Sequence, residues 1–245
     1  MNSQYDQIIQ AARWIKTAAF TVVFTGAGMS TESGIPDFRS PGGHWTKTDP
    51  AQVASVEAME YHYDLFHEFY TMRFQTLNRC NPHEGHRILA VWEQKELVQS
   101  IATQNVDGFH RQAGSQRVFE LHGALNHVRC IHKSHPGSPA DFIEKNPCGV
   151  CGDRLRPGVV LFGESLPLAA WDQVFYDIQK SDLLLVIGTS LQVSPVNQLP
   201  MMAKGKKILI NRDPVSSACH FDSVFQGTAG EVLQQLDDAL NEVDQ

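Results

Sequence analysis

Residues 20–34 read FTVVFTGAGMSTESG, and this stretch decides the fold. Its first six residues are apolar and β-branched, which is typical of a buried strand. The strand runs directly into Gly26-Ala27-Gly28. After a strand, a Gly-x-Gly turn lets the backbone approach a phosphate, and the following helix N-terminus supplies N–H donors. The stretch therefore predicts a nucleotide-binding α/β unit, although a plain tight turn explains the same glycines about as often.

An ordinary hydride-transfer dehydrogenase fits poorly. That class needs an acidic residue about 20 residues after the turn, at the end of a second strand. Residues 48–50 are Thr-Asp-Pro in a polar loop, with no strand before them.

Outside this stretch, apolar strands alternate with amphipathic helices. We expect strands at 99–103, 183–187 and 207–210, and helices at 4–16, at 56–78 and at the C-terminus. This alternation predicts an α/β fold with a Rossmann-like, doubly wound parallel sheet. Residues 128–157 break the rhythm with four prolines and three cysteines, which indicates a smaller inserted helical and zinc-ribbon-like module.

We expect one domain over residues 1–245, built from two parts. The large Rossmann part comprises 1–40, 84–127 and 155–245; the small part comprises a helical segment, 41–83, and a zinc-ribbon-like segment, 128–154.

Composition narrows the classes of function. The chain has 245 residues and a net charge of −7, which disfavours binding to nucleic acid. The longest apolar run, 183–187, is too short to cross a bilayer, so we expect no membrane partner. Five cysteines, an odd number, argue against a disulfide-stapled secreted domain and favour the cytoplasm.

Three segments carry a family resemblance: GAGMSTESGIPDFRS at 26–40, TQNVDG at 103–108 and LHG at 121–123. In this order they strongly resemble the sirtuin family of NAD-dependent protein lysine deacylases. The segments RPGVVLFGE at 156–164 and GTS at 188–190 fit the same pattern, and the resemblance spans about residues 15 to 240.

The resemblance implies an NAD-dependent protein lysine deacylase that acts on acylated lysines in proteins. The acyl oxygen displaces nicotinamide from NAD to give an alkylimidate, and then free lysine and O-acyl-ADP-ribose. NAD is consumed as a co-substrate. Two alternatives are mono-ADP-ribosyl transfer to protein and an NAD-binding sensor without turnover.

The same resemblance assigns the candidate catalytic residues, His122 and Asn105. An imidazole titrates near neutral pH and suits a base beside the ribose hydroxyls, although a lone histidine is more often a turn or surface residue. Asn105 would orient the ribose or a water, although with Asp107 it also suits an Asx turn. The cofactor-binding residues implied by the resemblance are Gly26, Ala27, Gly28, Thr31, Ile35, Asp37, Phe38, Arg39, Gln104, Asn105, Asp107, Gly188, Thr189, Ser190, Asn211 and Ala229.

Residues 159–163 should form an exposed edge at which, in the family, a substrate peptide adds as a strand. The plain alternative is a buried strand. The resemblance places Val160, Phe162 and Gly163 in the acyl-lysine site.

A second helical stripe, at 59–77, holds Tyr70 and Arg73. Arg73 either snorkels to solvent or binds an acyl carboxylate bidentately, with the Tyr70 hydroxyl adding a bond. With Ala54, these residues resemble the desuccinylase-like branch, so we expect desuccinylase or demalonylase activity beside deacetylase activity.

The cysteines of the inserted segment point to a metal. CGVC at 148–151 is one CxxC pair, and a zinc ribbon needs a second pair about 15–20 residues away. Cys130 has a suitable separation, but Lys133 stands where its partner is expected. Either His132 or the less cramped His135 could complete a Cys3His set. We expect a structural zinc at Cys130, His135, Cys148 and Cys151; the alternative is a metal-free remnant.

Overall fold

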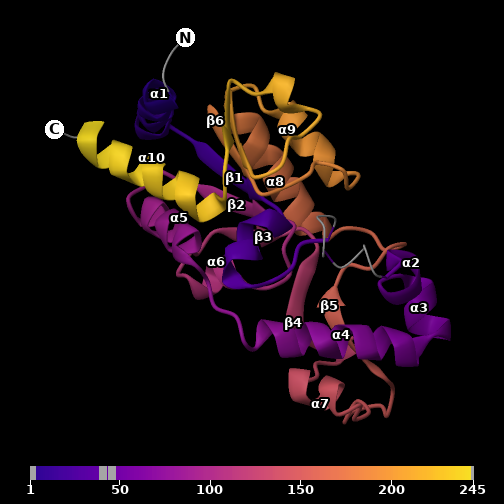
Figure 1. The fold of residues 1–245 in the computed structure, drawn as a ribbon. Coiled ribbons are helices and arrows are strands. Elements are labelled where there is room, and N and C mark those ends of the chain that lie inside the picture. The colour runs from indigo at the N-terminus through magenta and orange to yellow at the C-terminus, as the bar shows by residue number, and fades with distance from the viewer. Residues whose placement is uncertain (1–3, 39–42, 44–47, 244–245) are drawn as a thin grey trace.

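The computed structural model describes residues 4–38, 43 and 48–243. A parallel sheet of six strands, in the order β3-β2-β1-β6-β7-β8, forms its centre (Figure 1). The strands are β1 (Thr21–Thr25), β2 (Ser100–Thr103), β3 (Val118–Glu120), β6 (Leu183–Ile187), β7 (Lys206–Asn211) and β8 (Ser223–Gln226). The Rossmann-like prediction is confirmed.

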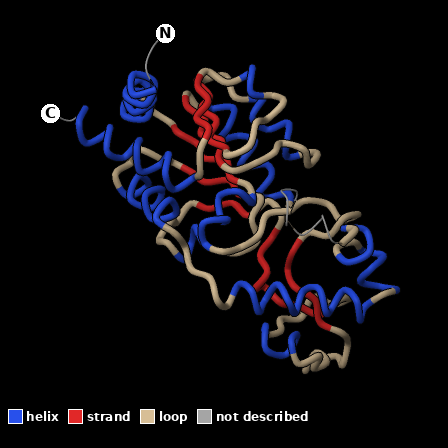
Figure 2. Tube along the Cα trace, viewed as in Figure 1, coloured by secondary structure: helices blue, strands red, loops and turns tan. Residues whose placement is uncertain are grey.

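Helices cover both faces of this sheet, because both sets of alternating strand side chains are apolar. One face packs Val23 and Leu185 against α1 (Gln4–Thr17), α5 (Glu84–Gln94) and α10 (Ala229–Val243). The other face packs Val22 and Leu184 against α8 (Leu168–Lys180), η3 (Val196–Gln198) and α9 (Leu199–Met202). Figure 2 shows the strands lying between helices. In the described part of the chain, no helix is both long and apolar enough to cross a membrane.

A smaller unit lies beside the carboxyl edge of the sheet and has its own apolar core (Figure 1). It contains an antiparallel pair and short helices: β4 (Gly123–Cys130), β5 (Leu155–Val159), α2 (Pro50–Val53), α3 (Val56–Tyr61), α4 (Tyr63–Leu77) and α7 (Pro139–Ile143). Three further short elements are η1 (Ala27–Ser33), α6 (Phe109–Gln112) and η4 (Ala218–His220). The exact bounds expected for the two parts remain a prediction.

Two local expectations need correction. The single helix over 56–78 is wrong, because the chain breaks at His62, which has φ −130° and ψ 43°. The break turns Tyr63 into the core, where its hydroxyl donates to the Leu155 carbonyl at 2.6 Å. The Gly-x-Gly turn opens a 3-10 helix, η1, and not an α-helix.

The sheet order explains where a ligand can bind. From β1 the chain builds outward through β2 and β3, and from β6 it builds the opposite way through β7 and β8. Ligands of open α/β sheets bind at such a reversal, outside the carboxyl ends of the strands. The predicted glycine turn follows β1, and Gly188 follows β6.

Candidate active site

The turns after β1 and β6 touch through their backbones. The Gly26 N–H donates to the Ile187 carbonyl at 3.0 Å, and the Gly28 N–H donates to the Gly188 carbonyl at 2.8 Å. A Cβ on Gly28 would lie 2.8 Å from the Gly188 Cα, so no side chain fits between the two turns. Because these glycines carry no side chain, backbone atoms form the floor of a crevice at the two turns.

A cavity of about 1200 Å³ opens from this floor and reaches the smaller unit. It brings together most of the residues predicted from sequence. The predicted cofactor and catalytic residues that line it are Ala27, Gly28, Thr31, Ile35, Asp37, Phe38, Gln104, Asn105, Asp107, His122, Gly188, Thr189, Ser190, Asn211 and Ala229. The predicted substrate residues that line it are Tyr70, Arg73, Val160, Phe162 and Gly163. Gly26 lies against Thr189 outside the lining set, and Arg39 falls outside the described residues.

His122 follows β3 and is half-buried in the cavity wall. Its Nδ1 lies 3.0 Å from the Gln104 carbonyl oxygen. A carbonyl can only accept, so Nδ1 carries the proton of the neutral ring and Nε2 keeps a free lone pair. Burial lowers the pKa of His122 below 6.5, and the Gln104 carbonyl opposes this only in part. The ring is therefore a neutral base at neutral pH.

A short network of hydrogen bonds between polar residues lies at the end of β2. The buried Asn105 Nδ2 donates to Ser30 Oγ at 3.1 Å, and Ser30 Oγ donates to Asp107 Oδ2 at 2.8 Å. The other carboxylate oxygen accepts from the Phe109 N–H at 2.9 Å. Burial raises the pKa of Asp107, and the bonds from Phe109 and Ser30 act against it. This network fixes the side-chain rotamers of Asn105 and Asp107 beside the glycine turn.

Gln104 links the same strand end to β6. Its Nε2 donates to Thr189 Oγ1 at 3.0 Å, and its backbone N–H donates to the Thr25 carbonyl at 3.0 Å. The carbonyl of Gln104 is the acceptor that orients His122. Gln104 thus ties the ends of β1, β2, β3 and β6 to each other.

At the far end of the cavity, Asn211 follows β7. Its Nδ2 donates to the Asp213 carbonyl at 2.7 Å. Glu32 of η1 accepts from the Gly230 N–H at 2.7 Å, which ties the glycine turn to the first turn of α10 beside Ala229. These contacts hold the two sides of this end together.

The opposite end of the cavity lies against α4. The Tyr70 side chain is 2% exposed, and burial raises its pKa to about 12. Burial lowers the pKa of Arg73, and the nearby Tyr70 opposes this. Arg73 contacts the rings of Phe38, Phe69 and Tyr70. Across the described residues, neither the Tyr70 hydroxyl nor the Arg73 guanidinium has a hydrogen-bond or ion-pair partner. Ala54 lines the same end.

Residues 159–163 form the remaining wall. The expected strand ends at Val159, and beyond it one isolated bridge joins Phe162 to Ser55. The Phe162 side chain is 50% exposed at the cavity mouth. The segment is therefore neither a plain buried strand nor a regular edge strand.

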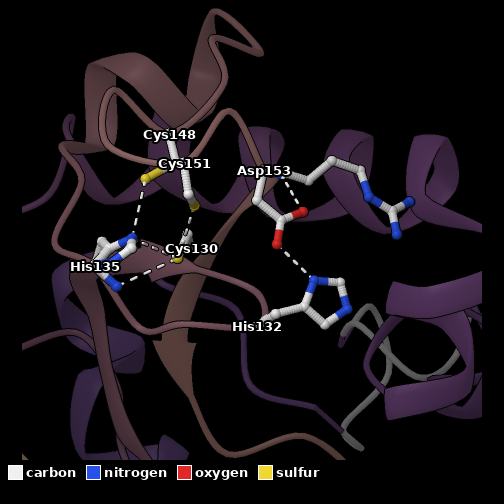
Figure 3. A network of polar contacts seen from close by, with 7 residues as sticks. Cys130, His132, His135, Cys148, Cys151 and Asp153 are labelled. Atoms are coloured by element: carbon white, nitrogen blue, oxygen red, sulfur yellow. Dashed lines mark hydrogen bonds and ion pairs between the residues drawn. The ribbon is translucent and has the colours of Figure 1, made fainter.

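The predicted metal ligands gather in the smaller unit (Figure 3), and none of them is among the residues that line the cavity. The ligand atoms of Cys130, His135, Cys148 and Cys151 lie within 4.8 Å of one another. His135 Nδ1 is 3.6 Å from Cys130 Sγ and 3.8 Å from Cys148 Sγ, and the Cys130 and Cys151 sulfurs are 3.8 Å apart.

These distances fit a tetrahedral zinc ion. Bonds of about 2.3 Å to sulfur and about 2.0 Å to nitrogen place neighbouring ligand atoms about 3.5–3.8 Å apart. Backbone N–H groups of Val150 and Cys151 lower the pKa of the Cys148 thiol to about 6, which favours the thiolate. His132, the other candidate, points away and lies 2.5 Å from Asp153 (Figure 3).

Sequence reasoning assigned no role to several residues of this site. Ser30 links Asn105 to Asp107, and its position directly after the glycine turn was the available signal. His110 Nε2 lies 3.1 Å from Thr25 Oγ1, behind the glycine turn, and no sequence signal marked it. Arg156 and Glu164 pair beneath the 159–163 wall, although both stand in a quoted motif.

Comparison with known proteins gives a consistent answer. Residues 26–195 match the model of the Sir2 family. The chain is 48% identical over 236 residues to the "NAD-dependent protein deacetylase 1" of Geobacillus kaustophilus, covering 94% of this chain and 98% of that protein.

Solved structures agree. A Sir2 homologue in complex with NAD superposes with a TM-score of 0.89 at 33% identity, covering 96% of this chain and 94% of the other. A Sir2 complex with a deacetylated peptide and acetyl-ADP-ribose superposes with a TM-score of 0.86 at 29% identity, covering 94% and 96%.

Proposed function

Because this chain belongs to the Sir2 family, we propose that it removes acyl groups from protein lysines with NAD as a consumed co-substrate. The products are nicotinamide, free lysine and O-acyl-ADP-ribose. One observation carries the proposal: His122, with Nδ1 bound to the Gln104 carbonyl, stands in the wall of the cavity that the glycine turn floors. If this histidine lay elsewhere on the surface, the cavity could bind a nucleotide but would have no general base in its wall.

His122 acts as the general base. Its Nε2 accepts a proton from a ribose hydroxyl of the bound co-substrate, and its Nδ1 stays hydrogen-bonded to Gln104. The new positive charge is then stabilised by the same carbonyl. The lowered pKa keeps the base unprotonated at neutral pH.

Asn105, Ser30 and Asp107 hold the nicotinamide end. The Asp107 carboxylate accepts from the carboxamide N–H groups of nicotinamide, with the backbone near Ile35 beside it. Ser30 is a positioning residue, because it fixes Asn105 and Asp107 relative to each other. Asn105 orients the nicotinamide ribose or a water.

The remaining cofactor residues bind along the floor and far end. The N–H groups at Ala27 and Gly28 face phosphate, and Arg39 would pair with it. Thr189 and Ser190 bind ribose or phosphate; Asn211 and Ala229 bind adenosine. Phe38 shields the reactive sugar carbon from water.

The acyl end supports a preference for acidic acyl groups such as succinyl and malonyl, with acetyl still accepted. Tyr70 and Arg73 line the cavity, and within the described structure their polar ends are unpaired. A half-buried guanidinium in a cavity wall is costly without an anion, and an acyl carboxylate supplies that anion. Ala54 leaves space for the longer chain.

Two further assignments complete the proposal. The substrate peptide lies along residues 159–163, by backbone pairing with the cavity wall. The Cys130, His135, Cys148 and Cys151 group holds a structural zinc, which cross-links the loop that carries β4 into β5. Its three reduced thiols suit a reducing compartment such as the cytoplasm.

One assay separates this function from its alternatives. The protein is incubated with NAD and matched peptides that carry acetyl- or succinyl-lysine. Release of nicotinamide with equal release of free lysine supports deacylation. Attachment of ADP-ribose to protein or peptide without release of free lysine supports ADP-ribosyl transfer. NAD binding without turnover supports an NAD sensor.

A further inference from the structure

Beneath the proposed substrate wall, the buried Arg156 forms an ion pair with Glu164, which is half-buried and lines the cavity. The Arg156 side chain is 2% exposed. Its Nη1 donates to Glu164 Oε1 at 2.5 Å, and its Nη2 donates to Glu164 Oε2 at 2.9 Å. This bidentate geometry fixes both side chains in one orientation.

The same two side chains also bind the backbone between them. Arg156 Nη2 donates to the Val159 carbonyl at 2.7 Å, and Nε lies 3.2 Å from the Pro157 carbonyl. Glu164 Oε2 accepts from the Leu161 N–H at 2.8 Å. The pair therefore closes a ring around residues 157–163 and saturates the inner polar groups of that segment.

The rest of the segment is held by its neighbours. The Phe162 N–H donates to the Ala54 carbonyl at 2.9 Å, and the Phe162 carbonyl accepts from the Val56 N–H at 3.1 Å. The Val160 N–H donates to the His122 carbonyl at 2.8 Å. The segment thus also steadies the backbone of the proposed base.

Two backbone groups of this segment remain without a hydrogen bond in the described part of the chain. Among the described residues, the Val160 carbonyl and the Gly163 N–H have no hydrogen-bond partner, and both residues line the cavity. An acceptor and a donor left unpaired on the cavity side of this wall are available to a bound peptide.

We propose that Arg156 and Glu164 are positioning residues for the acyl-lysine substrate. They hold residues 157–163 so that the Val160 carbonyl and the Gly163 N–H stay available to the substrate and the Val160 N–H braces His122. This rests on the deacylase function proposed above. The pair therefore does more than neutralise two charges, because it also fixes three backbone groups of the wall.

The first test is Glu164→Gln, which keeps one acceptor oxygen and loses the bidentate charged pair. We expect the KM for an acyl-lysine peptide to rise roughly ten- to a hundredfold, while the KM for NAD changes less than about threefold. Glu164→Asp, which keeps the charge, should recover part of the peptide KM. An unchanged peptide KM in Glu164→Gln overturns the proposal.

The matched control is Asp177→Asn. Asp177 pairs with Arg117 at 3.4 Å, its side chain is 2% exposed against 25% for Glu164, and it does not line the cavity. Because Asp177 is the more buried carboxylate, this variant should lower Tm at least as much as Glu164→Gln and leave both KM values unchanged. A rise in peptide KM in this control would reduce the effect at Glu164 to general destabilisation.

A backbone test needs no turnover. Calorimetry measures the Kd of acyl-lysine peptides in which each amide beside the acyl-lysine is replaced in turn by an ester. The ester that removes the N–H donor bound by the wall should weaken binding to the wild type about tenfold. The same ester should weaken binding to Glu164→Gln much less, because residues 157–163 are no longer held in place in that variant. Equal losses in both proteins contradict positioning. Absence of wild-type turnover would refute the deacylase function separately.

Discussion

The guanidinium carbon of Arg73 lies 5.4 Å from the centre of the Phe38 ring. Arg73 belongs to α4 at the proposed acyl end, and Phe38 belongs to the segment after η1 at the proposed cofactor end. A cation over an aromatic face is worth about 0.5–2 kcal/mol. The contact therefore joins the two substrate ends of the cavity through one side chain.

Replacing Arg73 by methionine should separate the two acyl activities. We expect kcat/KM for succinyl-lysine peptide to fall roughly a hundredfold, because the charge-assisted bonds to the acyl carboxylate are lost. Acetyl-lysine peptide should lose less than about fivefold, through the lost contact with Phe38. The exposed Glu68→Gln on the same helix is the control. Equal losses for both peptides would rule out the carboxylate clamp.

Removing the imidazole of His122 should abolish chemistry and spare NAD binding. General bases contribute about 10²–10⁴-fold, so His122→Ala should lose at least a hundredfold in deacylation. Calorimetry should find the Kd for NAD changed by less than about threefold. His127→Ala, an exposed histidine of β4, should retain full activity. Full activity in His122→Ala would remove the proposed base.

The acid limb of the rate profile should lie below pH 6.5. Burial lowers the pKa of His122 from 6.5, so the free enzyme keeps its base unprotonated to a lower pH than an exposed histidine would. We expect kcat/KM to stay flat from pH 8 down to about pH 6.5 and to fall below it. A profile that falls from above pH 7 would contradict the assigned protonation state.

Acid should destabilise the fold through His86, which packs between His83 and His110. Among the residues that the structure describes, neither ring nitrogen of this fully buried side chain has a hydrogen-bond partner, and burial lowers the pKa of His86 far below 6.5. The unfolded chain binds a proton below about pH 6.5 that the folded protein excludes, so stability is lost as pH falls. Between pH 7 and pH 5 this should cost about 2 kcal/mol of unfolding free energy.

His86→Leu tests this, because leucine cannot bind the proton. Denaturant unfolding at both pH values should show a pH-dependent loss about 2 kcal/mol smaller in the variant than in the wild type. His220→Leu, on the exposed η4, is the control and should keep the wild-type pH dependence. Equal pH dependence in all three proteins would mean that His86 does not exclude the proton.

Metal removal should loosen the smaller unit. A chelator strong enough to strip zinc should lower Tm by several degrees, and restoring zinc should recover it, because binding to the folded ligands is folding free energy. His135→Ala should bind zinc more weakly, whereas His132→Ala should bind it normally, because His132 pairs with Asp153. Metal analysis showing normal loading of His135→Ala would assign the fourth ligand elsewhere.

Local chemistry made much of this site predictable. The apolar run before Gly26 indicated strand β1, and the motif that continues through Phe38 indicated the glycine turn and the cofactor end of the cavity. All three features depend on the pattern of side chains along one continuous segment. The cysteine spacing likewise marked a metal site and favoured His135, the less cramped of two nearby histidines, over His132.

The sequence by itself determined the parallel α/β fold, through apolar strands that alternate with amphipathic helices along the chain. It also determined the glycine turn and the residue types of the base and its neighbours, because each of these is encoded within a short contiguous motif. Only the tertiary structure decided the break at His62, the link through Ser30 and the Arg156–Glu164 ring. These depend on which distant backbone groups remain unpaired after packing, and no periodicity along the chain records that.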